Sequence, residues 1–274
     1  MLAYIPSPSW SSFSLGPFTI HAYALCILLG VAIAIWLTIK RWKAVGGTED
    51  EVLDVALWAV PAGIIGGRIY HVATSPDSYF TPGKDPWEAV KIWHGGLGIW
   101  GAISLGTIVV YAACKHYKIN FINLLDAAAP GLLIAQGIGR WGNWFNQELF
   151  GTPTTLPWGL KIDPTNPNFP AGTPANTLFH PTFLYESLWN IAGAFFLLWL
   201  DKKFNMTGGK LFCAYIITYS IGRALIEPIR TDPSDYIMGI RLNVIISVIA
   251  SIIAATTIYF INKKQKNTEA TVMK

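Results

Sequence analysis

Charged residues are scarce in this chain of 274 residues, because Asp, Glu, Lys and Arg together make up only 13% of it. An ordinary soluble domain carries about 25%. The shortage excludes a disordered chain and a charge-rich nucleic-acid-binding protein, since both depend on dense charge. Hydrophobic residues make up 52%. This composition predicts an all-α integral membrane protein.

Cysteines and the common catalytic motifs are also missing or few. The three cysteines, Cys26, Cys114 and Cys213, lie in or beside apolar runs, without the spacing of a metal site or a disulfide framework. The chain has no Gly-x-x-x-x-Gly-Lys loop, His-Glu-x-x-His site or Gly-x-Ser-x-Gly elbow, so nucleotide hydrolysis, zinc proteolysis and α/β-hydrolase chemistry lack their usual residues. We expect no metal and no cofactor. No internal repeat is visible, which argues against duplicated transporter architectures.

Long apolar runs are plentiful. A membrane span needs about 20 mostly apolar residues. Seven runs qualify, at about 18–39, 52–73, 96–114, 122–141, 182–200, 210–227 and 238–262. We expect about seven transmembrane helices in a single polytopic membrane domain, 1–274. The longest connection, 145–181, is rich in proline, which predicts a small, irregular but stiffened head inserted between the fourth and fifth spans.

The basic residues of the connections predict the orientation of the chain. Twelve lie on one side of the predicted spans: Lys40, Arg41, Lys43, Lys115, Lys118, Lys202, Lys203, Lys210, Lys263, Lys264, Lys266 and Lys274. Five lie on the other: Lys84, Lys91, Lys161, Arg230 and Arg241. Because cytoplasmic loops carry the excess of Lys and Arg, we expect the N-terminus and the head outside and the C-terminus in the cytoplasm.

Five segments place unusual polar residues at one predicted level, near the outer boundary of the bilayer. These residues are Arg68, His94, Arg140, Asn143, Asn146, Glu148, His180, Glu186, Tyr219, Arg223 and Glu227. Charges at membrane depth are costly and usually face a protein interior or a wet cavity. Guanidinium groups bind phosphate well. The pattern therefore predicts a cavity that opens to the outer leaflet and handles an anionic lipid.

Several of these features also fit simpler interpretations. Arg68 near a helix end is consistent with snorkelling to the headgroups. Arg223 and Glu227 have the i,i+4 spacing of an ion pair that serves packing only. His180 can simply begin a helix, and Gly66-Gly67 can simply allow close helix packing. A transporter or flippase of an anionic lipid or organic phosphate would share the basic cavity, although it needs a path to both faces. A non-catalytic scaffold would not need five polar motifs at one depth.

Four motifs, in order, carry a family resemblance. Gly139-Arg140-Trp141-Gly142-Asn143-Trp144-Phe145-Asn146-Gln147-Glu148 resembles the signature of bacterial prolipoprotein diacylglyceryl transferases. The other motifs that match this family are His94-Gly95-Gly96-Leu97, His180-Pro181-Thr182-Phe183-Leu184-Tyr185-Glu186, and Tyr219, Arg223 and Glu227. Tyr23 and Arg68 also have counterparts. Thr152, after the matched Gly151, departs from the basic residue that many members carry there.

The resemblance implies an enzyme of the bacterial cytoplasmic membrane. Such an enzyme would transfer the diacylglyceryl group of phosphatidylglycerol to the lipobox cysteine of a prolipoprotein signal peptide and release glycerol 1-phosphate, the first step of lipoprotein maturation. The implied partners are these two substrates and membrane lipids, without nucleic acid.

The residue roles follow from the same resemblance and from the chemistry. We expect Arg140 and Arg223 to stabilise the leaving phosphate, and His94 either to act as the base for the thiol or to position substrate. The expected substrate-binding residues are Tyr23, Arg68, Asn143, Asn146, Glu148, Gly151, His180, Tyr185, Glu186, Tyr219 and Glu227.

Overall fold

The computed structural model describes residues 4–16 and 18–272; the side chains of Phe18, His94 and 268–272 are outside the description. The chain divides into two compact units. Residues 38–124 form the smaller unit, and residues 1–37 and 125–274 form the larger one. Helices α1 (Ala22–Ala44) and α5 (Phe121–Asn146) run from one unit into the other.

The smaller unit consists mainly of two long helices and the segment between them. Its elements are α2 (Glu49–Thr74), α3 (Asp77–Phe80), the 3-10 helices η1 (Pro86–Val90) and η2 (Ile92–His94), and α4 (Ile99–His116). A capping box begins α2, because Thr48 Oγ1 accepts from the backbone N–H of Glu51 and the Glu51 carboxylate accepts from the backbone N–H of Thr48.

Glycines allow α2 and α4 to approach closely. A Cβ on Gly66 of α2 would collide with the carbonyl oxygen of Gly101, and a Cβ on Gly101 of α4 would collide with that of Gly66. Just before α4, the backbone N–H of Gly98 donates to Gly67 O at 2.8 Å. Gly66-Gly67 therefore does serve close packing, as one of the simpler interpretations predicted.

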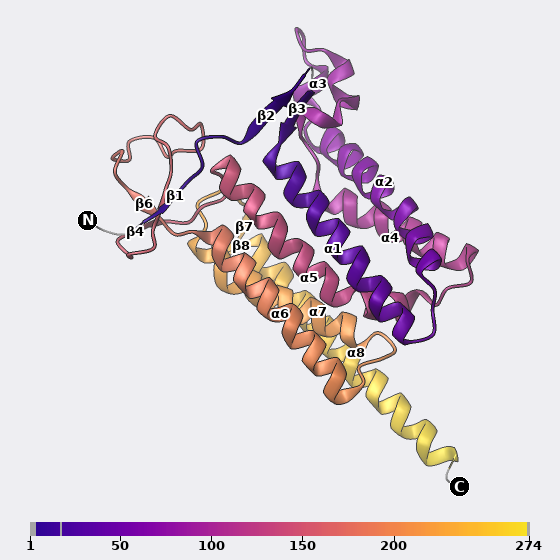
Figure 1. Ribbon diagram of the computed structural model, residues 1–274. Coiled ribbons are helices and arrows are strands. Elements are labelled where there is room, and N and C mark those ends of the chain that lie inside the picture. Colours follow the sequence, from indigo (N-terminus) through magenta and orange to yellow (C-terminus); the bar gives the residue numbers. More distant parts are fainter. Residues whose placement is uncertain (1–3, 17, 273–274) are drawn as a thin grey trace. The chain divides into compact units, whose positions relative to one another are not determined.

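Helices α5, α6 (Thr182–Phe204), α7 (Lys210–Ile226) and α8 (Leu242–Val272) run alongside one another in the larger unit (Figure 1). Their core contains Ala129 and Leu133 of α5, Ala194 and Leu197 of α6, and Leu211 and Ala214 of α7. Gly30 and Gly131 bring α1 against α5, since a Cβ on either would press on the backbone of the other helix. The small residues let these helix backbones pack closely.

The predicted head lies between α5 and α6. Short strands β4 (Pro153–Thr154), β5 (Leu160–Lys161) and β6 (Leu178–Phe179) form a sheet with β1 (Ile5–Pro6), in the order β1-β5-β6-β4. Strand β1 runs parallel to β5, and the other pairs are antiparallel. The head core consists of Phe150, Leu160, Ile162, Phe179 and Phe183.

Two hairpins and a 3-10 turn complete the larger unit. Strands β2 (Ser12–Leu15) and β3 (Phe18–His21) pair antiparallel before α1. The 3-10 helix η3 (Glu227–Ile229) follows α7, and the hairpin of β7 (Tyr236–Ile237) and β8 (Ile240–Arg241) leads into α8. The connection from α7 to α8 thus doubles back next to the end of α7.

The described helices confirm the fold class, an all-α integral membrane protein with a small head. Six of them are long and apolar enough to cross a membrane: α1, α2, α4, α5, α6 and Leu242–Asn267 of α8. The sixth predicted span, 210–227, is the helix α7, whose 17 residues give a length of about 25 Å. A span can be as short as about 17 residues, so α7 lies at the lower limit of length. Residues 18–21 of the first predicted run form β3 instead of helix.

Candidate active site

Two buried glutamates lie at the centre of an arginine cluster in the larger unit. Glu186 is in the first turns of α6, and Glu227 follows directly after α7. Glu227 is fully buried, and Glu186 is 6% exposed. Because an uncompensated buried carboxylate costs several kcal/mol, both glutamates need cations close by.

Helices α5 and α7 bring the two predicted catalytic arginines to these carboxylates. Arg140 Nε lies 2.5 Å from Glu186 Oε2. Arg223 Nη2 lies 2.7 Å from Glu227 Oε2, and its Nη1 lies 3.5 Å from Glu186 Oε1. The predicted i,i+4 pair on α7 is therefore present, and Arg223 also links the two glutamates.

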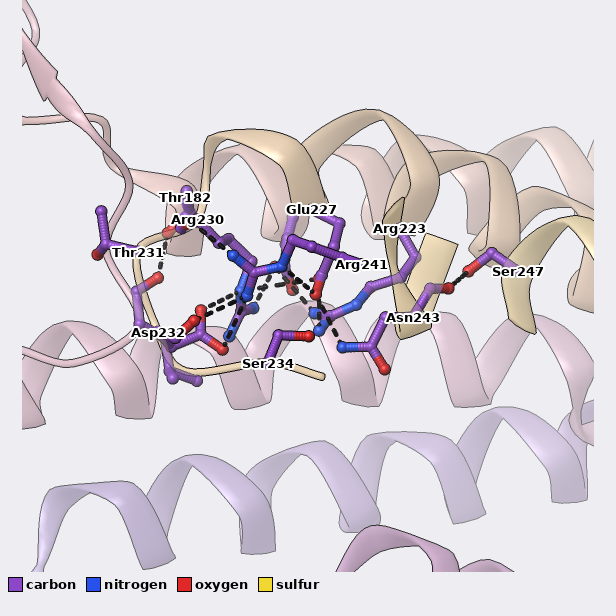
Figure 2. Close-up of polar contacts among 12 residues, drawn as sticks. Thr182, Arg223, Glu227, Arg230, Thr231, Asp232, Ser234, Arg241, Asn243 and Ser247 are labelled. Carbon is purple, nitrogen blue, oxygen red and sulfur yellow. Dashed lines mark hydrogen bonds and ion pairs between the residues drawn. The ribbon is translucent and has the colours of Figure 1, made fainter. Parts of the chain in front are cut away.

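Two further arginines come from the connection between α7 and α8. Arg230 Nη1 lies 2.7 Å from Glu186 Oε1, and Arg230 Nε lies 2.7 Å from Asp232 Oδ1. Arg241 Nε lies 3.0 Å from Glu227 Oε1, and Arg241 Nη1 donates to the backbone oxygen of Arg230 at 2.8 Å. Figure 2 shows Glu227 and Asp232 joined to these arginines by a continuous set of polar contacts.

The four arginines differ in exposure. The outer arginines, Arg140 and Arg223, keep 21% and 15% of their side chains exposed. The inner arginines, Arg230 and Arg241, keep 3% and 8%. Among the described residues, Nη1 and Nη2 of Arg140 have no hydrogen-bond or ion-pair partner. The outer arginines are therefore the ones with surface left to bind a ligand.

The ion-paired cluster carries one net positive charge, since four guanidinium groups face the three carboxylates of Glu186, Glu227 and Asp232. Burial works against the charge of Asp232, but the hydrogen bond from Arg230 and the charges of Arg230 and Arg241 hold the pKa of Asp232 below its ordinary value. Burial likewise works against the charge of Arg230, but Asp232 and Glu186 raise the pKa of Arg230 above its ordinary value. The positive charge that stays partly exposed in this cluster suits an anionic ligand.

Small residues and a tryptophan fix α5 against α6 at this level. A Cβ on Gly137 would lie 3.2 Å from Ser187 O and 3.5 Å from Asn190 Cβ on α6. Trp141 Nε1 donates to Ser187 Oγ at 3.1 Å. Because these contacts flank Arg140 in the sequence, they hold its guanidinium next to Glu186.

The two predicted asparagines share one carboxylate. Asn143 Nδ2 donates to Glu148 Oε1 at 2.8 Å, and Asn146 Nδ2 donates to the same oxygen at 3.3 Å. Helix α5 ends at Asn146, and Gln147 follows with a left-handed φ of 51°. The chain reverses its direction at Gln147, and this places the Glu148 carboxylate within hydrogen-bond distance of both asparagines.

Tyrosines lie beside both helices that carry the outer arginines. Tyr23 of α1 packs so closely on Gly142 that a Cβ there would collide with its ring. Tyr219 of α7, one turn before Arg223, stacks on Tyr215 with a centroid distance of 6.5 Å.

His180 and Tyr185 form a separate polar group at the start of α6. Their Nδ1 and hydroxyl oxygen lie 3.2 Å apart, and Trp158 Nε1 donates to the Tyr185 hydroxyl at 3.0 Å. Gly151 donates its backbone N–H to His180 O at 2.9 Å, and a Cβ on Gly151 would lie 2.8 Å from both His180 Cβ and Ile229 O. Glycine at position 151 therefore allows the head to pack against the segment after α7.

Arg68 and His94 belong to the smaller unit, where Arg68 binds backbone oxygens. Its guanidinium donates to Ala89 O at 2.9 Å, to Gly96 O at 3.1 Å and to Lys91 O at 3.3 Å, and also to Glu88 O and Gly95 O. His94 ends η2, and its side chain is outside the described part of the structure. Arg68 thus fixes the backbone on both sides of His94.

The glycines of the His-Gly-Gly-Leu motif have a physical reason. Gly95 and Gly96 have φ values of 84° and 76°, in the left-handed region that favours glycine. A Cβ on Gly96 would lie 2.8 Å from Arg68 Nη1. The motif therefore needs both glycines so that the backbone can turn around the guanidinium of Arg68.

The sequence reasoning missed three members of the cluster, Arg230, Asp232 and Arg241. Arg230 and Arg241 entered it only as basic residues of a connection. One sequence signal could have indicated Arg230, because it follows Glu227 by three residues. In the 3-10 helix η3 this spacing brings the two side chains into contact. Arg241 and Asp232 come together only because the β7–β8 hairpin folds back, which local periodicity does not reveal. Among the described residues, no group of His, Cys, Asp or Glu could hold a metal ion.

Comparison with known proteins gives the family. The family model described as prolipoprotein diacylglyceryl transferase matches residues 11–260. The chain belongs to this family. A phosphatidylglycerol–prolipoprotein diacylglyceryl transferase of Bifidobacterium adolescentis is 48% identical over 278 aligned residues, covering 98% of this chain and 83% of the relative.

Two further relatives support the assignment to the prolipoprotein diacylglyceryl transferase family. One from Paenarthrobacter aurescens with the same name is 46% identical, covering 98% of this chain and 86% of its own length. A relative from Streptomyces coelicolor, named phosphatidylglycerol–prolipoprotein diacylglyceryl transferase 2, is 52% identical over 88% of this chain and 76% of its own length. As a member of the prolipoprotein diacylglyceryl transferase family with several membrane-spanning helices, the chain is a membrane-embedded transferase.

Proposed function

We propose that the chain transfers the diacylglyceryl group of phosphatidylglycerol to the thiol of the lipobox cysteine in a prolipoprotein signal peptide, releasing glycerol 1-phosphate. The relatives are named for these two substrates. The reaction would be the first step of bacterial lipoprotein maturation. It needs an anion-binding site beside lipid and no redox step.

One observation carries this proposal: the outer arginines stay partly exposed, whereas the inner arginines are buried in ion pairs with carboxylates. The terminal nitrogens of Arg140, which have no partner among the described residues, can donate two parallel hydrogen bonds to a phosphate, the bidentate geometry that suits guanidinium. Arg223, held by Glu227 at 2.7 Å, adds a second positive charge to the same site.

The chemistry is a displacement at the glycerol carbon that carries the phosphate ester. The cysteine sulfur forms a bond to that carbon, the carbon–oxygen bond to phosphate breaks, and its electron pair leaves with glycerol 1-phosphate. The thiol loses a proton to a base, and the released phosphate takes one up or stays doubly charged. Negative charge grows on the phosphate, so cations placed there stabilise the transition state more than the ground state.

His94 is our candidate base, because an imidazole with an ordinary pKa near 6.5 can accept the thiol proton at neutral pH. Arg68 binds the backbone oxygens of Gly95 and Gly96 and would act by placing His94. A positioning role of His94 for substrate is the alternative, with the thiol proton lost to water near the arginines.

The remaining predicted residues would bind substrate. Asn143 and Asn146, held by Glu148, would orient phosphate or glycerol oxygens. Tyr219 would donate its hydroxyl to the lipid near Arg223. The residues proposed to support this site from its edges are Tyr23, Gly151, His180, Tyr185, Glu186 and Glu227.

We also propose the location of the enzyme. The excess of basic residues on one side of the spans supports a bacterial cytoplasmic membrane protein with its N-terminus outside and its C-terminus in the cytoplasm. In that orientation the arginine cluster faces the outer leaflet, where an exported prolipoprotein and phosphatidylglycerol meet.

The test is a transfer assay with the purified full chain in detergent micelles. It combines phosphatidylglycerol labelled in the diacylglyceryl part with a lipobox peptide that carries either Cys or Ser at the acceptor position. We expect label on the Cys peptide alone and release of glycerol phosphate. Label that crosses a reconstituted bilayer without peptide modification would instead favour a lipid flippase, the alternative that a basic cavity allows.

A further inference from the structure

The inner arginines and Asp232 use their polar atoms on one another and on the two glutamates. Arg241 contacts Glu227 Oε1, Arg230 O, Asp232 O at 2.9 Å and Asp232 Oδ2 at 3.6 Å. Arg230 contacts Glu186 and Asp232. Neither Arg230 nor Arg241 can bind a phosphate without breaking these buried contacts. Their effect on a ligand must therefore pass through the glutamates or through their charge.

Arg241 and Asp232 affect the outer arginine Arg223 in opposite senses. Arg241 occupies Oε1 of Glu227, the oxygen that Arg223 does not use, and so offsets part of the carboxylate charge that faces Arg223. The Asp232 carboxylate forms ion pairs with Arg230 and Arg241 and so offsets part of their positive charge. Buried charges at such distances are only weakly screened.

We propose that Arg241 and Asp232 are a positioning pair that sets how much positive charge Arg140 and Arg223 present to the substrate phosphate. The inference rests on the proposed function. A phosphodiester carries one negative charge, whereas the glycerol 1-phosphate that leaves approaches two. A site with more positive charge would hold the product too long, and one with less would bind the lipid poorly. The pair keeps the cluster between these limits.

The test measures binding of glycerol 1-phosphate to the purified full chain by calorimetry, together with KM and kcat for phosphatidylglycerol. Arg241→Gln removes one positive charge, and we expect glycerol 1-phosphate to bind about fivefold or more weakly and KM to rise. Asp232→Asn removes one negative charge, and we expect binding to tighten by a similar factor while kcat falls through slower product release. The double variant restores the charge balance and is expected to bind glycerol 1-phosphate within about twofold of the unmodified chain.

Arg241→Lys separates charge from hydrogen bonding. Lysine keeps the positive charge, so we expect near-normal affinity for glycerol 1-phosphate. It cannot form the several hydrogen bonds of the guanidinium fork, so the stability of the fold can fall without a loss of that affinity. Lys84→Gln, which removes an exposed positive charge in the smaller unit, is the matched control and should leave affinity and kcat unchanged. If Arg241→Gln does not fold, Asp232→Asn and Arg241→Lys still test the proposal.

The proposal is overturned if Asp232→Asn and Arg241→Gln both weaken binding, or if the double variant is no better than the worse single variant, because a purely structural role would add losses. Loss of affinity in Arg241→Lys equal to that in Arg241→Gln would also overturn it. If Arg241→Gln and Asp232→Asn shift the affinity in opposite directions but the unmodified chain does not transfer lipid to the Cys peptide, the charge-setting role of the pair is supported and the proposed function is rejected. The two failures are therefore distinguishable.

Discussion

In the described part of the chain, Arg140 of α5 contacts Glu186 of α6 only through Nε, which lies 2.5 Å from Oε2. This contact fixes the guanidinium plane and leaves its two terminal nitrogens for a ligand. A glutamate that orients an arginine in this way favours bidentate binding, because less side-chain freedom is lost when the phosphate arrives.

We expect Arg140→Gln to lower kcat for transfer by about a hundredfold or more, the usual loss when a donor to a developing negative charge is removed. Arg140→Lys should recover little activity, since its single ammonium would pair with Glu186 and leave no fork for the phosphate. Labelled-lipid transfer measures both variants. Lys203→Gln, an exposed change in the last turn of α6, should keep normal turnover. Near-normal turnover in Arg140→Gln would contradict the phosphate-binding role.

The pH dependence of stability should contain a contribution from Asp232. Its pKa in the folded chain is lowered by Arg230 and Arg241 despite burial, so its stabilising effect is present above the ordinary value near 3.9 and is lost as the pH falls through the folded value. Asp232→Asn should therefore differ most from the unmodified chain in thermal stability at pH 5 to 7. The difference should shrink below pH 4, and a constant difference from pH 7 to pH 3 would refute this account.

A base role of His94 predicts a specific pH profile. In the unmodified chain, kcat/KM should rise with pH as the imidazole of His94 loses its proton and becomes able to accept the thiol proton. His94→Gln should lower kcat/KM and remove that rise between pH 6 and pH 9. His116→Gln at the exposed end of α4 is the control. If His94→Gln keeps both the activity and the rise, His94 is not the base.

Two glycines on the α2–α4 pair offer a matched stability test. We expect Gly66→Ala to lower the melting temperature in detergent, because the new Cβ would collide with the Gly101 backbone and Leu105. Gly106→Ala should be neutral or stabilising, since the new Cβ would lie 3.9 Å from its nearest neighbour outside the helix, Gly63 Cα. Alanine also favours the helix over glycine by about 1 kcal/mol. Equal effects of the two substitutions would show that close packing at Gly66 does not limit stability.

Local sequence patterns predicted the helices and the Arg223–Glu227 pair, because both depend on residues close in sequence. The partner of Arg140 was not predicted, since Glu186 reaches it across two helices packed through Gly137 and Ser187. The run 210–227 predicted α7 to within one residue, because the α-helix ends at Ile226 and turns into η3. The carbonyl partners of Arg68 depend on the fold of residues 88–96, which periodicity cannot supply.

The sheet of the head contains a strand from near the beginning of the chain. Ile5 pairs with Leu160, Trp144 Nε1 donates to Pro6 O, and Gln147 Nε2 donates to Pro8 O. Strand β1 therefore has no partner until the ribosome has made the chain as far as Leu160, on the order of ten seconds later. The contacts that join β1 to β5 and to the end of α5 can therefore form only after α1, α2, α4 and α5 have been synthesised.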